Sequence, residues 1–374
     1  MSEQKVSLIT GCTGQDGSYL AEHLLEEGHK VVGLTRRVST TNSQRIAHLL
    51  SDQSFEVVEG DVADSGSVFT IVDNHKPTYL FNLAAQSHVG SSFEQPFYTT
   101  DVNYGGVLNC LEAIRRFSPQ TRFYQASTSE MFGDNVDVTQ DCCMGQIQCP
   151  DPLGSYQDED TAFSPMSPYA VAKTAAHYLV NNYRKAYDIH GSCGILFNHE
   201  SPRRGDLFVT QKIIKWVKQF NSWHVDGLTY CAESNENNIR CFERDFTDSE
   251  MFPKLRLGNL DAYRDWGHAW DYVRAMHLMV QQDEPDDYVV ATGEAHSVRD
   301  FLDIVFGLIG IDDWSDYVVI DPKFFRPSEV PYLRGISNKA QQKLGWKPQY
   351  SFEDLVRDML GEVVGEKEET NQSS

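Results

Sequence analysis

The chain opens with a strand, a glycine-rich turn and a helix, and this order constrains its fold more than any other feature. Residues 6–10 form an apolar run, and Gly11, Gly14 and Gly17 follow it in a G-x-x-G-x-x-G turn. Apolar side chains with helical spacing begin within residues 18–27. Glycines in such a turn let the backbone approach a pyrophosphate at the helix N-terminus. A glycine triple alone is a weak signal, but between a strand and a helix it predicts a dinucleotide-binding site.

Strands and helices continue to alternate along the first half of the chain. Further strands are predicted at residues 30–34, 55–58, 79–83, 122–126, 194–197 and 288–291. Helices are predicted at residues 44–50, 68–74, 104–117, 168–187 and 269–282. Such alternation implies right-handed crossovers and helices on both faces of a parallel sheet. The sequence therefore predicts an α/β fold, with a Rossmann-type doubly wound parallel sheet and a smaller C-terminal α/β lobe that binds substrate.

The alternation loosens after His199, which indicates the start of a second lobe. A length of 374 residues suits such a two-lobed enzyme. We expect residues 1–198 to form the dinucleotide-binding lobe, completed by residues 267–293. Residues 199–266 and 294–374 are expected to form the substrate-binding lobe. Two polar stretches with cysteines, residues 134–160 and 221–253, are interpreted as surface insertions.

Composition excludes several classes of function. The chain is 40% hydrophobic and 23% charged, as expected for a globular protein in water. No apolar run approaches the roughly 20 residues that cross a bilayer, and the start has no apolar leader, so a cytoplasmic location is expected. A net charge of -22 argues against nucleic acid or an anionic membrane as partner. The eight cysteines have no metal-ligand spacing, so reduced thiols and no metal site are expected.

The residues after the second strand indicate which dinucleotide the turn binds. Arg36 and Arg37 stand where NAD-binding chains usually carry an acidic residue for the ribose hydroxyls. Two arginines instead suit the 2′-phosphate of NADP, although an exposed basic turn would look the same. Asp61, after the third strand, is expected to face the adenine. The small residues of 83–88, after the fourth strand, would let the chain pass close to the cofactor.

Two further patterns predict proton transfer at the same edge of the sheet. Residues 125–133 place hydroxyls and the Glu130 carboxylate just past a strand, where ligands bind in parallel sheets. Local turn bonds of Ser and Thr would also explain this run. Tyr169 and Lys173 are four residues apart on a helix and so share one face. A nearby lysine cation lowers the pKa of a tyrosine and makes it a usable base, although such pairs also occur on solvated helices.

Together these motifs resemble the extended short-chain dehydrogenase/reductase family, whose members act on nucleotide sugars. Over nearly the whole chain the sequence is similar to the GDP-mannose 4,6-dehydratase branch of that family. The longer stretches that carry this resemblance are residues 10–20, 125–130, 197–205, 257–261, 264–268 and 326–330. The resemblance implies NADP as cofactor, GDP-mannose as substrate and GDP-4-dehydro-6-deoxy-mannose as product.

The resemblance also implies a role for each catalytic residue. Tyr169, assisted by Lys173, would take the proton of the sugar 4-hydroxyl while hydride leaves C4. Glu130 would then remove the proton at C5, because the new ketone acidifies it. Water would leave from C6 with help from Thr128 and Glu130, and hydride would return to C6. An epimerase needs no carboxylate at this place, so Glu130 distinguishes the two reactions.

Binding residues follow from the same comparison. Expected cofactor contacts are Gly11, Thr13, Gly14, Gln15, Asp16, Gly17, Arg36, Arg37, Asp61, Val62, Leu83, Ala84, Ala85, Ser87, Tyr98, Tyr169, Lys173, His199 and Arg204. Expected substrate contacts are Ser87, Thr128, Ser129, Glu130, Tyr169, Asn198, Arg203, Lys212, Arg264, Arg326 and Glu329. Arginines suit the diphosphate because the guanidinium fork matches its oxygens.

Two other functions remain open at this point. An epimerase or reductase of the same fold would act on another nucleotide sugar without losing water. A non-catalytic NADP-binding protein would usually have lost Tyr169, Lys173 or Glu130, and all three are present. Residues 36–45 resemble a loop that mediates subunit contacts, so a homodimer or homotetramer is expected.

Overall fold

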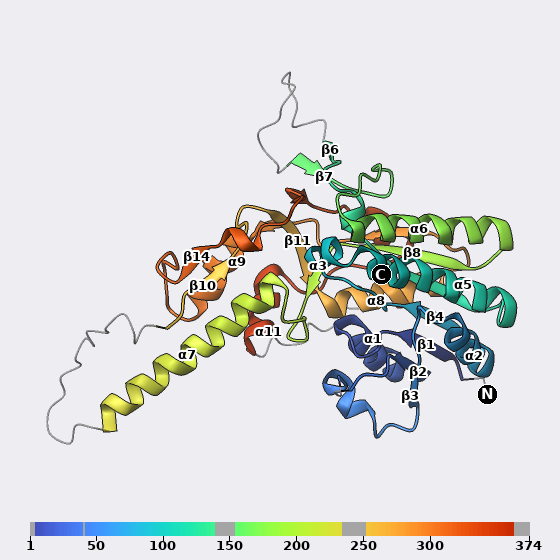
Figure 1. Ribbon diagram of the computed structural model, residues 1–374, viewed down its shortest axis with the longest axis horizontal. Helices are drawn as coiled ribbons and strands as arrows, with labels where there is room; N and C mark the ends of the chain where they lie inside the picture. Colours follow the sequence, from blue (N-terminus) through green and yellow to red (C-terminus); the bar gives the residue numbers. More distant parts are fainter. Residues whose placement is uncertain (1–3, 40–41, 139–153, 234–251, 363–374) are drawn as a thin grey trace, which may run out of the picture.

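The computed structural model describes residues 4–39, 42–138, 154–233 and 252–362 (Figure 1). Its larger part is a sheet of seven parallel strands in the order β12-β8-β5-β4-β1-β2-β3. These strands are β1 (Val6–Thr10), β2 (Lys30–Thr35), β3 (Phe55–Glu59), β4 (Tyr79–Asn82), β5 (Arg122–Thr128), β8 (Gly191–Leu196) and β12 (Asp287–Val290). The strand order reverses between β1 and β4, and a ligand crevice forms at such a reversal, beyond the carboxyl ends of the strands.

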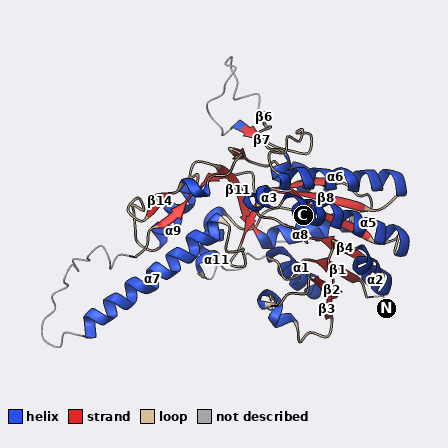
Figure 2. Cartoon of the chain, in the orientation of Figure 1, coloured by secondary structure: helices blue, strands red, loops and turns tan. Residues whose placement is uncertain are grey.

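Helices cover both faces of this sheet, as the alternation predicted (Figure 2). One face carries α2 (Ser65–His75), α5 (Gly106–Phe117) and α6 (Pro168–Tyr187), and the other carries α1 (Gln15–Glu26), α8 (Ala269–Gln281) and α10 (Asn338–Leu344). Each face has its own apolar core, because strands buried on both sides supply side chains alternately to the two layers. The predicted α/β fold with a doubly wound parallel sheet is confirmed.

A second, smaller core lies beside the carboxyl ends of the sheet. It is built on α7 (Val209–Glu233), α9 (Val298–Leu308), α11 (Phe352–Leu360) and the parallel pair β10 (Leu255–Leu257) and β14 (Val318–Ile320). A four-stranded sheet joins the two parts, and its strands are β9 (Asn198–Glu200), β11 (Tyr263–His268), β13 (Ala295–Ser297) and β15 (Tyr332–Leu333). In it β11 pairs in parallel with β9, the strand that follows β8 directly.

Shorter elements occupy the loops between these layers. They are α3 (Val89–Glu94), α4 (Pro96–Thr100), a π-helical turn (Asp101–Gly105) that leads into α5, and the hairpin of β6 (Asp137–Val138) and β7 (Ser155–Tyr156). The helix predicted at residues 44–50 is a 3₁₀ helix, Gln44–Leu49. The helix predicted from residue 68 begins at Ser65, because the Asp64 side chain caps it by accepting from Gly66 N–H.

Several expectations concern residues outside the described part of the chain. Most of both predicted insertions falls there, including Cys142, Cys143, Cys149 and Cys241. Among the described residues, the free cysteines Cys12, Cys110 and Cys193 are all buried. Within the same described ranges, no helix combines the length and the apolar character that crossing a membrane requires.

Candidate active site

A cavity of about 930 Å³ lies at the carboxyl ends of the sheet, and residues of both lobes line it. Every residue predicted for the cofactor or the substrate lines it, with the exception of Arg37. Strand ends β1, β4 and β5 and helix α6 form one wall, and segments after β9, β10 and β14 form the other. Its volume is at the upper end of the range that is usual for ligand pockets.

The glycine turn has the geometry of a pyrophosphate cradle. Gly11 has a φ of +72°, and a Cβ there would lie 3.0 Å from the Ala84 backbone. A Cβ on Gly17 would lie 2.3 Å from the Gly11 carbonyl oxygen, so α1 packs against the turn only with glycine there. Gly14 is the N-cap of α1 and has no side chain, which leaves the first N–H groups of the helix to a ligand. These residues fit a dinucleotide.

Hydroxyl and carbonyl groups hold the ends of strands β1, β4 and β5 in place. The Thr10 hydroxyl donates to the Asn82 side chain at 2.7 Å and accepts the backbone N–H groups of Leu83 and Ala84 at 3.0 Å. Asn82 in turn donates to Gln125 at 2.9 Å. Because this network fixes the crevice, the predicted cofactor residues of 83–85 stand opposite the glycine turn.

The predicted tyrosine–lysine pair lies against the end of β5. Ser167 caps helix α6 by accepting from Ala170 N–H, and Pro168 occupies the first turn. Lys173 Nζ donates to the Ala126 carbonyl oxygen at 2.7 Å, and it lies 5.9 Å from the centre of the Tyr169 ring. The Thr128 side chain lies beside the Tyr169 phenol and lowers its pKa. The helix and the strand end therefore present their polar groups to one point of the cavity.

The pKa values of this pair differ from the prediction. Burial raises the pKa of Tyr169 to about 12, and the Glu130 charge adds to this, although the Thr128 side chain lowers it. Burial lowers the pKa of Lys173 to about 8. Lys173 was expected to lower the pKa of the tyrosine, but desolvation of the phenolate has the larger effect here. A further positive charge beside the phenol would favour its ionised form.

Glu130 projects into the cavity from a single 3₁₀ turn after β5. The Thr128 hydroxyl caps that turn, accepting Glu130 N–H at 3.3 Å. Arg326 lies 3.5 Å from the Glu130 carboxylate and 3.6 Å from Glu329. Arg264 donates to the same Glu329 carboxylate at 2.8 Å. Two arginines thus lie beside a nearly buried carboxylate, which keeps positive charge in this part of the cavity.

His199 and Asp16 form an ion pair across the cavity floor. His199 Nε2 lies 2.9 Å from the Asp16 carboxylate, and Nδ1 lies 2.8 Å from the Phe197 carbonyl oxygen. Both partners can only accept, so both ring nitrogens donate and the imidazole is cationic. Burial opposes ionisation of both groups, but their contact outweighs it, raises the pKa of His199 and lowers that of Asp16 to about 2. A fixed cation therefore lies next to the glycine turn.

The remaining predicted basic residues have distinct partners. Arg203 pairs with Glu22 at 2.8 Å and lies over the Tyr19 ring at 3.9 Å, so it also ties the second wall to α1. Arg204 lies 2.9 Å from the buried Glu200 carboxylate. Lys212 lies over the Phe324 ring at 4.7 Å. These cations line the cavity but are already held by neighbours, which fixes their positions.

The two arginines predicted to read the 2′-phosphate are in different surroundings. Arg36 lines the cavity and donates to the Tyr98 hydroxyl at 2.7 Å. The Arg37 side chain is 87% exposed and lies 4.0 Å from Glu59, outside the cavity. The structure therefore brings one of the two predicted arginines, together with Tyr98, to the cofactor side of the cavity.

Some cavity residues were missed by sequence reasoning. Arg45 donates to the carbonyl oxygens of Thr13 at 3.3 Å and Arg203 at 2.8 Å, so it joins the glycine turn to the opposite wall. His88 caps α3 through Nδ1, which accepts Ser91 N–H at 3.1 Å. Nothing in the local pattern marks Arg45, because its role depends on a loop folding back across the cavity. His88 stood inside a predicted stretch but had no assigned contact.

The parallel sheet, the glycine turn and the tyrosine–lysine helix define the class of the short-chain dehydrogenases/reductases. A family model described as GDP-mannose 4,6 dehydratase matches residues 8–244 and 247–359. The chain belongs to this family.

Individual relatives agree with that assignment. GDP-mannose 4,6 dehydratase 2 of Arabidopsis thaliana is 46% identical over 96% of this chain and 87% of its own. GDP-mannose 4,6-dehydratase of Sinorhizobium fredii is 41% identical over 100% of both chains. Among solved structures, UDP-glucose 4-epimerase of Thermus thermophilus, in complex with NAD, has a TM-score of 0.73 at 22% identity, over 95% of this chain and 98% of that one. The last likeness concerns the fold alone.

Proposed function

We propose that the protein is an NADP-dependent GDP-mannose 4,6-dehydratase that forms GDP-4-dehydro-6-deoxy-mannose. The single observation that carries the proposal is Glu130, buried beside the Tyr169–Thr128 contact in a cavity that also has a dinucleotide cradle. Oxidation at C4 needs a tyrosine base and a hydride acceptor, and loss of water needs a second proton-transfer group next to them. Membership of the family and the activity of the relatives described above support the same reaction.

The cofactor would lie along the glycine turn and the end of β4. A bound nicotinamide dinucleotide supplies hydride acceptance and return and, when oxidised, a positive charge that lowers the pKa of a neighbouring phenol. Gly11, Gly14 and Gly17 would receive its pyrophosphate. Arg36 would hold the 2′-phosphate of NADP, since a guanidinium makes charge-assisted bonds to phosphate oxygens. The cationic His199 and Arg45 are near the turn and would add to the positive potential there.

Tyr169 and Thr128 would act on the sugar 4-hydroxyl. The phenolate accepts the hydroxyl proton as hydride leaves C4, and Thr128 holds the phenol in position. Lys173 is held by a main-chain carbonyl and keeps a positive charge near the ring. A hydride thus leaves C4 and a proton leaves its hydroxyl oxygen, and the product is a ketone.

Glu130 would carry out the elimination. The C4 ketone acidifies the C5 hydrogen, and the carboxylate removes it as a proton. The electron pair left at C5 forms the C5–C6 double bond and expels the C6 hydroxyl, which departs as water with a proton from Glu130 and help from Thr128. Returned hydride adds to C6, and a proton adds to C5. Arg326 lies 3.5 Å from Glu130 and is positioned to hold the carboxylate in place.

The basic groups of the second wall would bind the GDP part. Arg264, Arg326 and Lys212 line the cavity away from the glycine turn, and Glu329 orients both arginines. Asn198, Arg203 and Ser87 line the cavity between this wall and the cofactor side. Guanidinium groups match diphosphate oxygens in pairs, which reconciles an acidic protein with an anionic substrate.

We further propose the lobe division and the assembly. Strand β12 completes the parallel sheet beside β8, which supports assigning residues 267–293 with 1–198 to the cofactor lobe. Residues 199–266 and 294–374 would form the substrate lobe, although α10 packs against α8 of the first lobe. The resemblance of residues 36–45 to a loop that mediates subunit contacts supports a homodimer or homotetramer. A monomeric mass in solution would rule out the assembly.

Incubation with GDP-mannose in deuterated water tests the reaction. The expected product has lost one water relative to the substrate and carries deuterium at C5. The deuterium enters because the proton that Glu130 removes from C5 is replaced from the solvent. Mass spectrometry and proton NMR measure both changes. An epimerised or reduced sugar without loss of water would instead assign the chain to another reaction of the same fold. Unchanged GDP-mannose, with another nucleotide sugar consumed, would contradict the substrate.

A further inference from the structure

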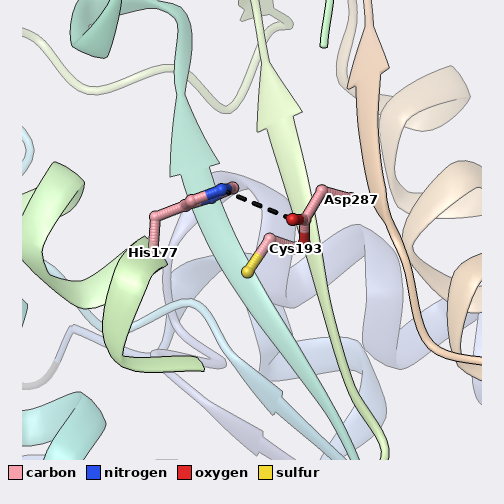
Figure 3. A group of neighbouring side chains, drawn as sticks. All are labelled: His177, Cys193 and Asp287. Atoms are coloured by element: carbon pink, nitrogen blue, oxygen red, sulfur yellow. Dashed lines mark ion pairs between the residues drawn. The ribbon is translucent and has the colours of Figure 1, made fainter. Parts of the chain in front are cut away.

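A largely buried polar cluster lies on the side of the sheet covered by α6 (Figure 3). His177 comes from α6, Cys193 from β8 and Asp287 from β12. His177 Nε2 lies 3.5 Å from the Asp287 carboxylate, and His177 Nδ1 lies 3.1 Å from the Ser127 hydroxyl. Arg184 donates to the other Asp287 oxygen at 2.7 Å. The cluster therefore links one helix to three neighbouring strands.

Metal binding is the first use to consider for a histidine, a cysteine and an aspartate. Their potential ligand atoms lie within 4.8 Å of one another. However, the Arg184 guanidinium already neutralises Asp287, and burial raises the pKa of the Cys193 thiol well above its usual value. A divalent ion needs the thiolate and would lie close to a fixed cation. The contacts favour a hydrogen-bonded link over a metal site.

The protonation state of His177 determines which of its ring nitrogens donates and which accepts. Burial lowers the pKa of His177, so the imidazole is neutral at pH 7 and carries one N–H. Asp287 can only accept, so that N–H is on Nε2 and Nδ1 is left as an acceptor. The Ser127 hydroxyl therefore donates to Nδ1. Ser127, which had no assigned role next to Thr128, is anchored to the helix by this bond.

The same helix face carries the proposed catalytic pair. Tyr169, Lys173 and His177 follow one another at intervals of four residues on α6, so they project to the same side. They contact three consecutive residues of β5, because Tyr169 meets Thr128, Lys173 meets the Ala126 carbonyl, and His177 meets Ser127 between them. Of these three contacts, only that of His177 continues to the edge strand β12.

We propose that His177 is a positioning residue for the reaction, and this inference rests on the proposed dehydratase function. By holding Ser127 of β5 and Asp287 of β12 at once, it sets the depth at which α6 sits on the sheet. That depth decides where the Tyr169 hydroxyl lies relative to Thr128 and the sugar. His177 does not line the cavity, so it acts through the tyrosine and not on the substrate.

His177→Phe tests this, because it keeps a ring but removes the hydrogen bond with Ser127 and the contact with Asp287. We expect kcat to fall on the order of tenfold to a hundredfold, since small misplacement of a catalytic group has such effects. KM for GDP-mannose should stay within about twofold, because the substitution removes no contact between the protein and the substrate. His177→Gln, whose amide can donate to Asp287 and accept from Ser127, should restore part of kcat. An equal kcat for wild type and His177→Phe would overturn the proposal, as would no gain from glutamine.

Two further variants separate positioning from general loosening. Val180→Ala leaves a cavity under the same helix but removes no polar group of the cluster, and should lower the melting temperature with little change in kcat. Ser127→Ala should lower kcat as His177→Phe does, and the double variant should lose no more than either single one. If His177→Phe folds poorly, Ser127→Ala and Val180→Ala still test the proposal. Additive losses, or an equal loss in Val180→Ala, would overturn the proposal.

Wild-type protein assayed in the same series separates the two claims. An inactive wild type would contradict the proposed function. An active wild type together with undiminished variants would contradict only the role of His177.

Discussion

Glu130 is the residue on which the proposed reaction most depends. It lies in the cavity because the Thr128 hydroxyl caps the short turn that carries it. In Glu130→Gln we expect dehydration to fall by roughly 10²- to 10⁴-fold, the usual contribution of general acid–base groups. Cofactor affinity should persist, and both quantities can be measured on the same preparation by product formation and fluorescence titration. Glu94→Gln, at an exposed cavity carboxylate, is the control and should retain activity.

Arg36 and Arg37 offer a matched pair for the choice of cofactor. Arg36→Ala should weaken NADP by roughly 10- to 100-fold and NAD far less, because a hydrogen bond to a charged group is worth about 1.5–3 kcal/mol. Arg37→Ala should have a smaller effect, since its side chain lies outside the cavity. Dissociation constants for both dinucleotides, measured for both variants, check this. Equal losses for NADP and NAD in Arg36→Ala would mean that the residue does not recognise the 2′-phosphate.

Residue types and their spacing predicted much of the cavity, because helical and strand periodicities place i and i+4 groups reliably. They did not predict electrostatics. The pKa of Tyr169 depends on burial by several elements, and the different surroundings of the adjacent Arg36 and Arg37 depend on a loop path. The spacing of residues along the chain determines neither the burial of Tyr169 nor the path of the loop that carries the two arginines.

Strand β11 is held to the rest of the molecule by Asp265. Its carboxylate accepts bonds from Thr292 N–H and hydroxyl at 2.8 and 2.7 Å, Gly293 N–H at 2.9 Å and Gly335 N–H at 3.2 Å. Asp265→Asn would turn an amide NH₂ toward backbone donors, so we expect a loss of about 2–3 kcal/mol of stability. Asp261→Asn, at an exposed ion pair, should cost less than about 1 kcal/mol. Urea unfolding of both variants measures the difference, and similar losses would contradict the clamp.

Capping residues in the sequence predict where some helices begin, and Ser167 and Pro168 mark the start of α6 in this way. The joining sheet could not be predicted, because its parallel pairing of β9 with β11 connects residues far apart in the chain, such as Asn198 and Trp266. Such non-local pairs leave no periodic signal in either segment. The sequence also suggested an α-helix where Gln44–Leu49 is 3₁₀, since the two share most of their apolar spacing.

The whole molecule should lose stability in mild acid through three clustered histidines. His23 Nε2 and His277 Nδ1 are 3.0 Å apart, and the His29 ring packs against that of His277. Burial lowers all three pKa values, to about 4 for His29 and about 3 for His277. As the pH falls, these histidines become protonated in the unfolded chain before they do so in the folded one. The free energy of unfolding is therefore at its full value above about pH 6.5 and declines below it, by roughly 2 kcal/mol at pH 5 for each of His29 and His277.

Urea unfolding at pH 7.5 and pH 5 measures this loss. His277→Gln can keep a side-chain hydrogen bond while removing one titrating group, so its stability should depend less on pH over that interval. A variant with the same pH dependence as the wild type would show that other groups cause the acid sensitivity.

The acceptor of the Lys173 ammonium is a peptide carbonyl, that of Ala126, and no side chain takes part in that bond. Any residue that keeps the same strand conformation could offer the same oxygen. Evolutionary covariation between these two positions should therefore be weak, even though they touch at the centre of the proposed chemistry. A comparison of many homologues would therefore identify the lysine but not the residue at position 126 that it contacts.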